Sequence, residues 1–387
     1  MHVITRLILG GAQENTLLTV EGLHRRDDYD VALVTGPALG PEGSLIERAH
    51  RNGVRLILLP SMRREIHPAR DLVTLHALTD LFREKRPHIV HTHSSKAGIL
   101  GRMAARRARV PVIIHTIHGP PFHPHQGALS NVIFKSLERR VGRYTDRIIS
   151  VADAMTAQFE AAGVAPRGGY VTIHSGMEVE PFLAKDGARR RVREEFGLAP
   201  DDLVIGKIAR LFHLKGHEDV LDAFPEVARR FPKAKLLFVG DGILRDDLAA
   251  QAERLGVRDR LVFAGLVPTR RIPEMIKAMD VLVHASLREG LARVLPQALL
   301  SGCPVISTDT DGACEVVRPG ETGFLVDVKD VAGLRDAMIE TLGDLPKARA
   351  MALEGRRRFT GQFRAETMVR RIVEVYDEEL QRVAEGG

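Results

Sequence analysis

The chain has 387 residues, more than one hydrophobic core usually supports, so two domains of ordinary size are expected. Hydrophobic residues make up 44% and charged residues 27% of the sequence, a balance that excludes an intrinsically disordered protein. The formal net charge is +6, but aromatic residues reach only 5% and tryptophan is absent, which argues against a nucleic-acid-binding protein. An anionic membrane surface or phosphorylated substrates account better for the positive charge.

The cysteines and the apolar runs indicate the compartment. Cys303 and Cys314 cannot build a disulfide framework or a cysteine-based zinc site, which fits a reducing cytoplasm. No run reaches the ~18 consecutive apolar residues of a membrane span, and the apolar run at the N-terminus is too short for a signal peptide. We therefore expect a cytoplasmic protein that could lie peripherally on the inner face of the membrane.

Short β-rich runs alternate with helical patterns through the first half of the chain. This alternation predicts a parallel sheet with helices on both faces and ligands at the carboxyl ends of its strands. Gly10 and Gly11 follow the first run, where small residues allow close backbone approach to a ligand; an ordinary tight turn is the alternative. The expected strands are Val3–Leu7, Tyr29–Thr35, Arg55–Leu59, His88–Thr92, Val112–Thr116, Arg147–Val151 and Tyr170–His174.

Histidines are dense after the fourth and fifth expected strands, in HTHSSKAG (91–98) and HTIHGPPFHPH (115–125). His115, His118, His123 and His125 are the candidate metal ligands in the second segment. Prolines interrupt that segment and no acidic co-ligand lies nearby, so no metal site is expected.

A basic amphipathic helix is expected between Leu129 and Arg143. Such a helix can lie on an anionic bilayer, or it can pack its apolar stripe on the sheet and expose its charges to solvent. The apolar positions are Leu129, Val132, Ile133, Leu137 and Val141, and the basic ones are Lys135, Arg139, Arg140 and Arg143.

The second half opens a new alternation. Arg210 and Lys215 follow its first strand and precede a helix, where two cations can hold a diphosphate. Gly240 and Gly242 follow the second strand. The absence of GxGxxG argues against a dinucleotide oxidoreductase. The expected strands are Leu203–Ala209, Lys235–Val239, Leu261–Ala264, Val281–Ala285, Val305–Thr308 and Phe324–Val326.

The stretch LREGLARVLPQALLSGCPVISTDT (287–310) predicts a loop, a helix and a strand. Proline is tolerated in the first turn of a helix, so Pro296 places the helix start near Ala292 or Arg293. The helix amides beside Gly290 suit a phosphate. The carboxylate of Glu289 suits the hydroxyls of a sugar.

This stretch resembles the signature of the retaining nucleotide-sugar glycosyltransferases of family 4, which have the GT-B fold. The family has a glutamate in an E-G loop, a second glutamate eight positions on, and then a G-x-P-V strand start. Glu289 corresponds to the first glutamate, which in the family contacts the transferred sugar. The position of the second glutamate, which in the family binds the ribose, is occupied here by Gln297. Compared with a glutamate, the amide of Gln297 keeps a hydrogen-bond acceptor for the ribose hydroxyls but loses the charge-assisted hydrogen bond. Arg210 and Lys215 match the family pattern R-x-x-x-x-K-G.

The resemblance implies the remaining site residues. His118, followed by glycine, would reach the donor sugar, and the run 261–268 resembles the segment beside the nucleotide base. Asp309-Thr310-Asp311 is interpreted as a loop without metal, and no cofactor or metal is required. The implied catalytic residues are Glu289, His118, Arg210 and Lys215; the implied donor-binding residues are Gly10, Gly11, Gly240, Gly242, Leu266, Gly290, Leu291, Ala292, Arg293 and Gln297.

The resemblance covers essentially the whole chain and implies an α/β protein with two doubly wound Rossmann-like domains facing across a cleft. Residues 1–178 would form the acceptor-side domain, completed by a returning C-terminal helix at 364–387. Residues 179–363 would bind the nucleotide sugar. The segment HSGMEVEPF (174–182) resembles the family's connection between the two.

The activity implied is transfer of a sugar, with retention, from a nucleotide diphosphate sugar to a lipid-linked or saccharide acceptor in envelope or exopolysaccharide synthesis. We expect the donor to be a UDP-sugar. One alternative is a GT-B enzyme acting on the nucleotide sugar itself, such as an epimerase or a phosphorylase. The other is a catalytically silent scaffold subunit, which the amide at Gln297 suggests.

Overall fold

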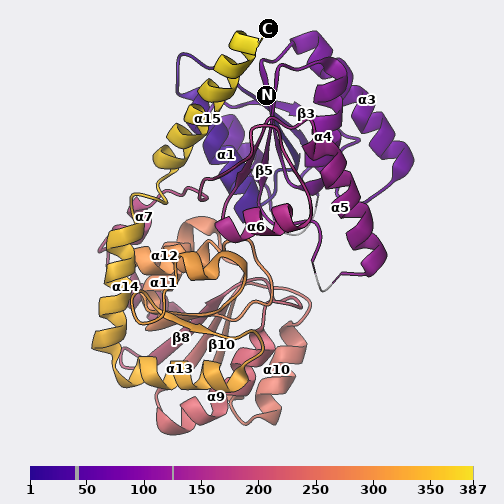
Figure 1. Ribbon diagram of the computed structural model, residues 1–387. Coiled ribbons are helices and arrows are strands. Elements are labelled where there is room, and N and C mark those ends of the chain that lie inside the picture. Colours follow the sequence, from indigo (N-terminus) through magenta and orange to yellow (C-terminus); the bar gives the residue numbers. More distant parts are fainter. Residues whose placement is uncertain (40–42, 124–125, 387) are drawn as a thin grey trace. The chain divides into compact units, whose positions relative to one another are not determined.

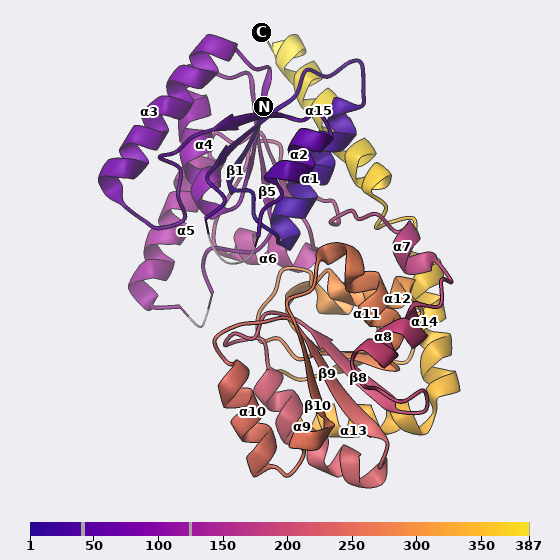
Figure 2. The same cartoon turned by 180° about the vertical axis from the view of Figure 1, so that it is seen from behind.

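The computed structural model describes residues 1–39, 43–123 and 126–386. Its chain contacts divide it into two compact units, Met1–Met177 with Gln362–Gly387, and Glu178–Gly361. Each unit is a parallel sheet covered by helices (Figures 1 and 2). The predicted alternation is thus confirmed in both halves, because strands buried on two faces produce short continuous apolar runs.

The first unit contains a seven-stranded sheet in the order β3-β2-β1-β4-β5-β6-β7. Its strands are β1 (His2–Arg6), β2 (Ala32–Gly36), β3 (Arg55–Leu58), β4 (Ile89–His93), β5 (Val112–Ile117), β6 (Arg147–Ser150) and β7 (Tyr170–Thr172). Its helices are α1 (Gly11–His24), α2 (Ile46–Arg51), α3 (Pro68–Lys85), α4 (Ser95–Ala108), α5 (Ala128–Gly142), α6 (Asp153–Ala161) and α15 (Ala365–Gly386).

The helices of the first unit enclose two apolar layers. Residues of α1 and α15 share one buried cluster with β1, β2 and β5, and residues of α3 and α4 share the other with the opposite face of the sheet. The last helix therefore belongs to the first unit, as predicted, although more than 180 residues of the second unit precede it in sequence. Met368, Ile372 and Tyr376 form its buried stripe.

The second unit contains a six-stranded sheet in the order β10-β9-β8-β11-β12-β13. Its strands are β8 (Leu203–Ile208), β9 (Ala234–Val239), β10 (Leu261–Gly265), β11 (Val281–His284), β12 (Val305–Thr308) and β13 (Phe324–Val326). Its α-helices are α7 (Glu180–Leu183), α8 (Ala188–Glu195), α9 (His217–Arg230), α10 (Arg245–Arg254), α11 (Ile272–Ala278), α12 (Val294–Leu300), α13 (Val331–Gly343) and α14 (Leu345–Phe359), and its 3₁₀ turns are η1 (Arg258–Arg260), η2 (Thr269–Arg271) and η3 (Asp311–Glu315).

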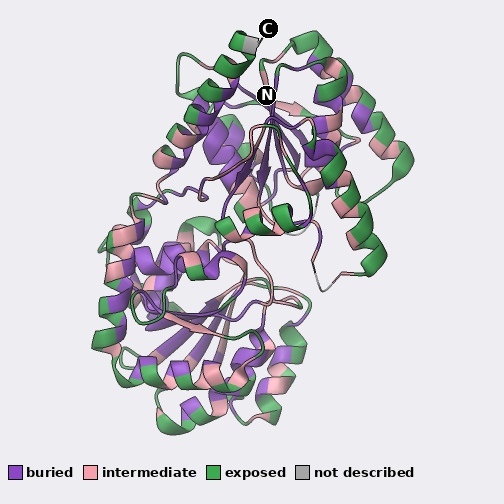
Figure 3. Ribbon diagram, in the orientation of Figure 1, coloured by how far each residue is buried: buried purple, intermediate pink, exposed green. Residues whose placement is uncertain are grey.

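The strand order places a switch point in each sheet. In the first sheet, β2 and β3 lie on one side of β1, and the strands from β4 onward lie on the other side of β1. In the second sheet, β9 and β10 lie on one side of β8, and the strands from β11 onward lie on the other side of β8. Loops that leave a switch point diverge to opposite faces, so the carboxyl ends of those strands are where open α/β sheets bind ligands. Figure 3 shows the strands of both sheets as largely buried and the outer helix faces as exposed.

Candidate active site

The candidate site of the second unit lies at its switch point. Lys215 is in the loop after β8, and Glu289 is in the loop after β11. Lys215 Nζ lies 2.5 Å from Glu289 Oε1, and His284 Nε2 lies 3.6 Å from the same oxygen. The two residues that the sequence singled out 74 positions apart thus form one ion pair.

Close contacts between the backbones of the two loops bring Lys215 and Glu289 together. Gly216 has φ 65°, and a Cβ there would lie 1.9 Å from the carbonyl oxygen of Ala285. Only glycine allows the Lys215–Gly216 turn to approach the end of β11 so closely. The amide of Leu287 donates to the carbonyl of Leu214 at 2.9 Å, which fixes the two loops to each other.

The loop that carries Glu289 is held from its other side by the segment after β12. Asp311 Oδ2 accepts a hydrogen bond from the Glu289 amide at 2.8 Å, and the Gly312 amide donates to the Gly290 carbonyl at 3.0 Å. The hydroxyl of Thr310 donates to the carbonyl of Ser286 at 2.9 Å. The Asp-Thr-Asp segment therefore positions the Glu289 loop, a role that sequence reasoning missed because it depends on the pairing of β11 with β12.

The charge state of Glu289 follows from its neighbours. Burial opposes ionisation of this carboxyl, but the adjacent His284 ring and the charge of Lys215 outweigh burial and hold its pKa well below the usual range. Burial lowers the pKa of His284, so its imidazole is neutral at neutral pH. Glu289 is therefore a carboxylate that accepts hydrogen bonds, and it is unsuited to donate a proton.

The predicted glycines after β9 are needed for close packing. Gly240 has φ 136°, and a Cβ there would lie 2.1 Å from the carbonyl oxygen of Ala209. A Cβ at Gly242 would lie 2.4 Å from the carbonyl oxygen of Leu211. These contacts bring the turn after β9 against the loop that carries Arg210, whose guanidinium carbon lies 5.0 Å from the ring centre of Phe212.

The helix in the central stretch begins slightly later than predicted. α12 starts at Val294 with Arg293 at its N-cap, and Pro296 lies in its first turn, where a missing N–H is harmless. Gln297 is buried on this helix, and Gly290, Leu291 and Ala292 form the turn that leads into it. Leu266 follows β10 and is 61% exposed.

The predicted residues of the first unit lie after β1 and β5. Gly10 is the N-cap of α1, and Gly11 is its first residue, so the glycine pair forms a strand-to-helix turn. His118 follows β5 and is half-buried, and His118 Nε2 lies 3.2 Å from His93 Nδ1. Of the four histidines considered as metal ligands, His115 instead bonds the Thr92 hydroxyl at 2.9 Å, and His125 lies outside the described residues.

Sequence comparisons identify the family. Residues 188–358 match glycosyl transferases group 1, and residues 10–176 match a glycosyl transferase 4-like domain. A GDP-mannose-dependent alpha-(1-6)-phosphatidylinositol monomannoside mannosyltransferase of Mycolicibacterium smegmatis is 32% identical over 266 residues, which cover 67% of this chain and 68% of that protein. The chain belongs to the group 1 glycosyltransferases.

A second curated relative aligns over more of this glycosyltransferase. The UDP-Gal:alpha-D-GlcNAc-diphosphoundecaprenol alpha-1,3-galactosyltransferase of Escherichia coli is 28% identical over 352 residues, 89% of this chain and 87% of that enzyme. Among solved structures, Anabaena HepE in complex with UDP and glucose has a TM-score of 0.82 at 21% identity, covering 97% of this chain and 98% of HepE. The structural likeness confirms the predicted GT-B fold.

Arg293, the N-cap residue of α12, places a cation at the N-terminal end of that helix. A cation at the positive end of a helix is locally unfavourable, so we predict that it serves an anion of the donor or the acceptor. Arg293→Leu should raise the Michaelis constant of that substrate about two- to fivefold, with a smaller effect at high salt. Steady-state kinetics at two salt concentrations test this. Unchanged kinetics with a lowered melting temperature would instead indicate a structural ion pair, with an acid such as Glu315.

Proposed function

We propose that this glycosyltransferase moves a sugar from a UDP-sugar to a lipid-linked saccharide acceptor in cell-envelope polysaccharide synthesis, with retention at the anomeric carbon. The Lys215–Glu289 pair at the switch point of the second sheet is the observation that carries the proposal. The Escherichia coli relative, named for UDP-galactose and a diphosphoundecaprenol-linked sugar, supports the donor and acceptor classes. The Mycolicibacterium relative is named for GDP-mannose, so the base must be tested directly.

The proposed chemistry relies on stabilising the leaving group. Transfer breaks the bond between the anomeric carbon and a diphosphate oxygen and forms a bond from that carbon to the acceptor oxygen. Negative charge grows on the diphosphate, and Arg210 and Lys215 would stabilise it. Glu289, held ionised, would accept hydrogen bonds from the sugar hydroxyls. The departing diphosphate would take the proton of the acceptor hydroxyl, and no metal step is required.

His118 would contact the donor sugar, as the family resemblance implies. It directly follows β5 at the carboxyl edge of the sheet, the edge at which open α/β sheets bind ligands. An imidazole there can donate to a sugar oxygen or accept from a sugar hydroxyl, depending on which ring nitrogen carries the proton.

A donor and acceptor screen tests the proposal. The protein would be incubated with UDP-glucose, UDP-galactose, UDP-N-acetylglucosamine and GDP-mannose, with and without a polyprenyl-diphosphate-linked N-acetylglucosamine acceptor and with and without EDTA. We expect an acceptor-dependent α-linked product from one UDP-sugar, identified by the anomeric proton coupling, and no loss with EDTA. A β-linked product would refute retention. Turnover without acceptor, giving an epimer or a sugar phosphate, would favour the epimerase or phosphorylase alternative.

A membrane-facing surface would suit a lipid-linked acceptor. Leu129, Val132 and Ile133 lie on one side of α5 and are 74%, 64% and 48% exposed, whereas Val141 near the end of the helix is buried. The expected apolar stripe is therefore packed on the protein only in part. Arg140 and Arg143 are also exposed and would attract anionic lipids. Among the described residues, no helix meets the length and hydropathy needed to span a membrane.

Changing Leu129, Val132 and Ile133 together to serine should lower binding to vesicles of phosphatidylglycerol and phosphatidylcholine at least about tenfold. The reason is that burial of three such side chains contributes roughly 1.5–3 kcal/mol each. Co-sedimentation measures the binding. Leu353→Ser in the second unit, where the side chain is 52% exposed on α14, is the matched control. Equal vesicle binding by the triple variant and the wild type would refute the surface.

A further inference from the structure

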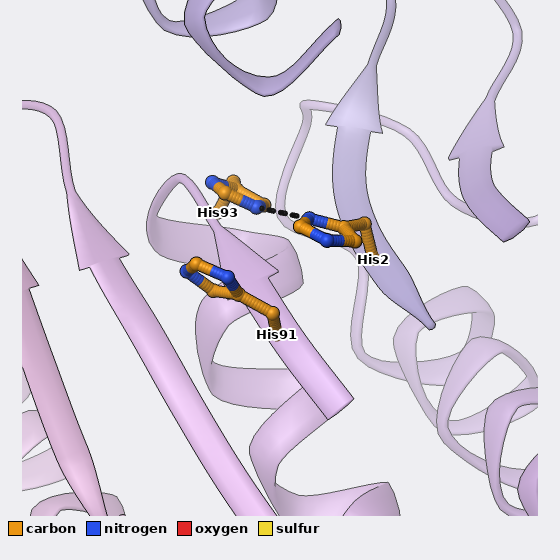
Figure 4. Close-up of side chains that lie close together, drawn as sticks. All are labelled: His2, His91 and His93. Carbon is orange, nitrogen blue, oxygen red and sulfur yellow. Dashed lines mark hydrogen bonds between the residues drawn. The ribbon is translucent and has the colours of Figure 1, made fainter. Parts of the chain in front are cut away.

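Three buried histidines meet on the face of the first sheet that α1 and α15 cover. His2 begins β1, and His91 and His93 alternate along β4, so all three rings lie on the same face, with His93 directed toward His2 (Figure 4). His91 and His93 are 0% exposed and His2 is 2% exposed. Neither their contacts nor their burial was expected from the sequence.

These rings belong to a continuous chain of hydrogen bonds that ends at His118. Thr116 Oγ1 lies 2.7 Å from His91 Nε2, and His91 Nδ1 lies 2.6 Å from Tyr376 Oη. Tyr376 Oη lies 3.1 Å from His2 Nε2, and His2 Nδ1 lies 3.0 Å from His93 Nε2. His93 Nδ1 then lies 3.2 Å from His118 Nε2. We call these six residues the imidazole chain.

Every interior member of the imidazole chain can donate only one hydrogen bond along it. Burial lowers the pKa of His2, His91 and His93 well below 6.5 and raises that of Tyr376, so all four are neutral at physiological pH. A neutral imidazole has one donor and one acceptor nitrogen, and a phenol has one proton. The protons therefore all point toward His118 or all point away from it, because any other arrangement leaves two donors or two acceptors facing each other, or leaves the buried Tyr376 hydroxyl without an acceptor in the chain.

We propose that the imidazole chain sets the tautomer and ring orientation of His118, and that His2, His91, His93 and Tyr376 are positioning residues for it. With the protons pointing toward His118, its Nε2 accepts and its Nδ1 carries the proton. With the protons pointing away, its Nε2 donates and its Nδ1 is the acceptor. The chain thus decides whether His118 offers Nδ1 as a donor or as an acceptor to a ligand. The catalytic part of this inference rests on the proposed sugar contact of His118.

A metal ion is the rival explanation for the cluster. Possible ligand nitrogens of His2, His91 and His93 lie within 4.8 Å of one another. However, both nitrogens of each ring already have a hydrogen-bond partner in the imidazole chain. A metal bound by all three would therefore displace a hydrogen bond at each ring. The hydrogen-bonded chain accounts for all six nitrogens without such changes.

Tyr376→Phe tests the chain, because it removes one oxygen and two of the five links without touching His93 or His118. In ¹⁵N-histidine-labelled protein, two-bond proton–nitrogen correlation reads the tautomer of each imidazole. We expect one dominant His118 tautomer in the wild type and a changed tautomer ratio in the variant. For a donor that is turned over, kcat should fall about tenfold with the donor KM unchanged.

Tyr29→Phe is the matched control. The ring centre of Tyr29 lies 6.2 Å from that of Tyr376, and its hydroxyl bonds Asp377 rather than a member of the chain. It should leave the His118 signals and kcat unchanged. Should Tyr376→Phe fail to fold, Thr116→Val removes the end link instead and should shift the His118 tautomer in the same direction.

The outcomes separate the chain from the proposed function. A tautomer change at His118 in Tyr376→Phe but not in Tyr29→Phe supports the chain even if no nucleotide sugar is turned over, in which case only the proposed function fails. Unchanged His118 signals in both Tyr376→Phe and Thr116→Val, in an enzyme that transfers sugar, overturn the proposal that the imidazole chain sets the His118 tautomer. Stoichiometric zinc in the purified protein, with EDTA shifting the signals of His2, His91 and His93, would also overturn it in favour of a metal site.

Discussion

Replacing Lys215 by alanine is expected to lower kcat about 10²- to 10³-fold while the protein stays folded. Lys215 follows β8 at the switch point and already lies 2.5 Å from Glu289, so its ammonium is fixed where the diphosphate of a donor would lie. Charge on the diphosphate is larger in the transition state than in the bound donor. The loss should therefore fall mainly on kcat rather than on the donor KM. Steady-state rates with the donor identified by the screen measure it.

Two companion variants separate catalysis from structure. Lys233→Ala removes a lysine whose partner, Asp201, is likewise exposed, and should leave kcat unchanged. Glu289→Gln keeps the shape of the Glu289 side chain but removes its charge, and should also lower kcat strongly. If Lys215→Ala and Glu289→Gln lower the melting temperature but leave kcat near the wild-type value, the ion pair is structural and the scaffold alternative gains support.

The fold was largely predictable because its strands are buried on both faces. Each of the thirteen runs expected from apolar, β-branched composition is a strand, with ends displaced by a few residues, as at β2, where Tyr29 lies before the strand. Lys215 and Glu289 could each be singled out from the sequence, because each lies in a separate motif. Their contact could not be predicted, because it depends on the close approach of Gly216 to Ala285, which only the paired strands define.

The imidazole chain was beyond reach of sequence reasoning for a similar reason. The motif HTH at 91–93 is visible, but its partners are His2, 89 residues away from His91, and Tyr376 on a helix that returns from the far end of the chain. The pairing of β1 with β4 brings His2 opposite His91. Local periodicity carries no information on that register, whereas the same periodicity was enough to find the strands themselves.

Lys207→Met is expected to stabilise the second unit, by roughly 2–4 kcal/mol at pH 7. Lys207 lies in β8 with its side chain 0% exposed, and its Nζ has no hydrogen-bond partner among the described residues. Burial, reinforced by the charge of Lys215, lowers its pKa from 10.5 to about 7. The folded state therefore disfavours the ammonium form, and methionine removes that penalty while filling a similar volume.

The sign of the pH dependence makes the Lys207 prediction specific. Below about pH 7 the amine is charged in both folded and unfolded chains, so the penalty is fully present; between pH 7 and 10.5 the folded protein loses its proton first, and the penalty declines. Urea unfolding at pH 7 and at pH 9.5 should show a larger gain for Lys207→Met at pH 7. Lys235→Met, on the neighbouring strand with its amine near the surface, should show no such difference. A gain independent of pH would mean that packing, rather than the charge of Lys207, limits stability there.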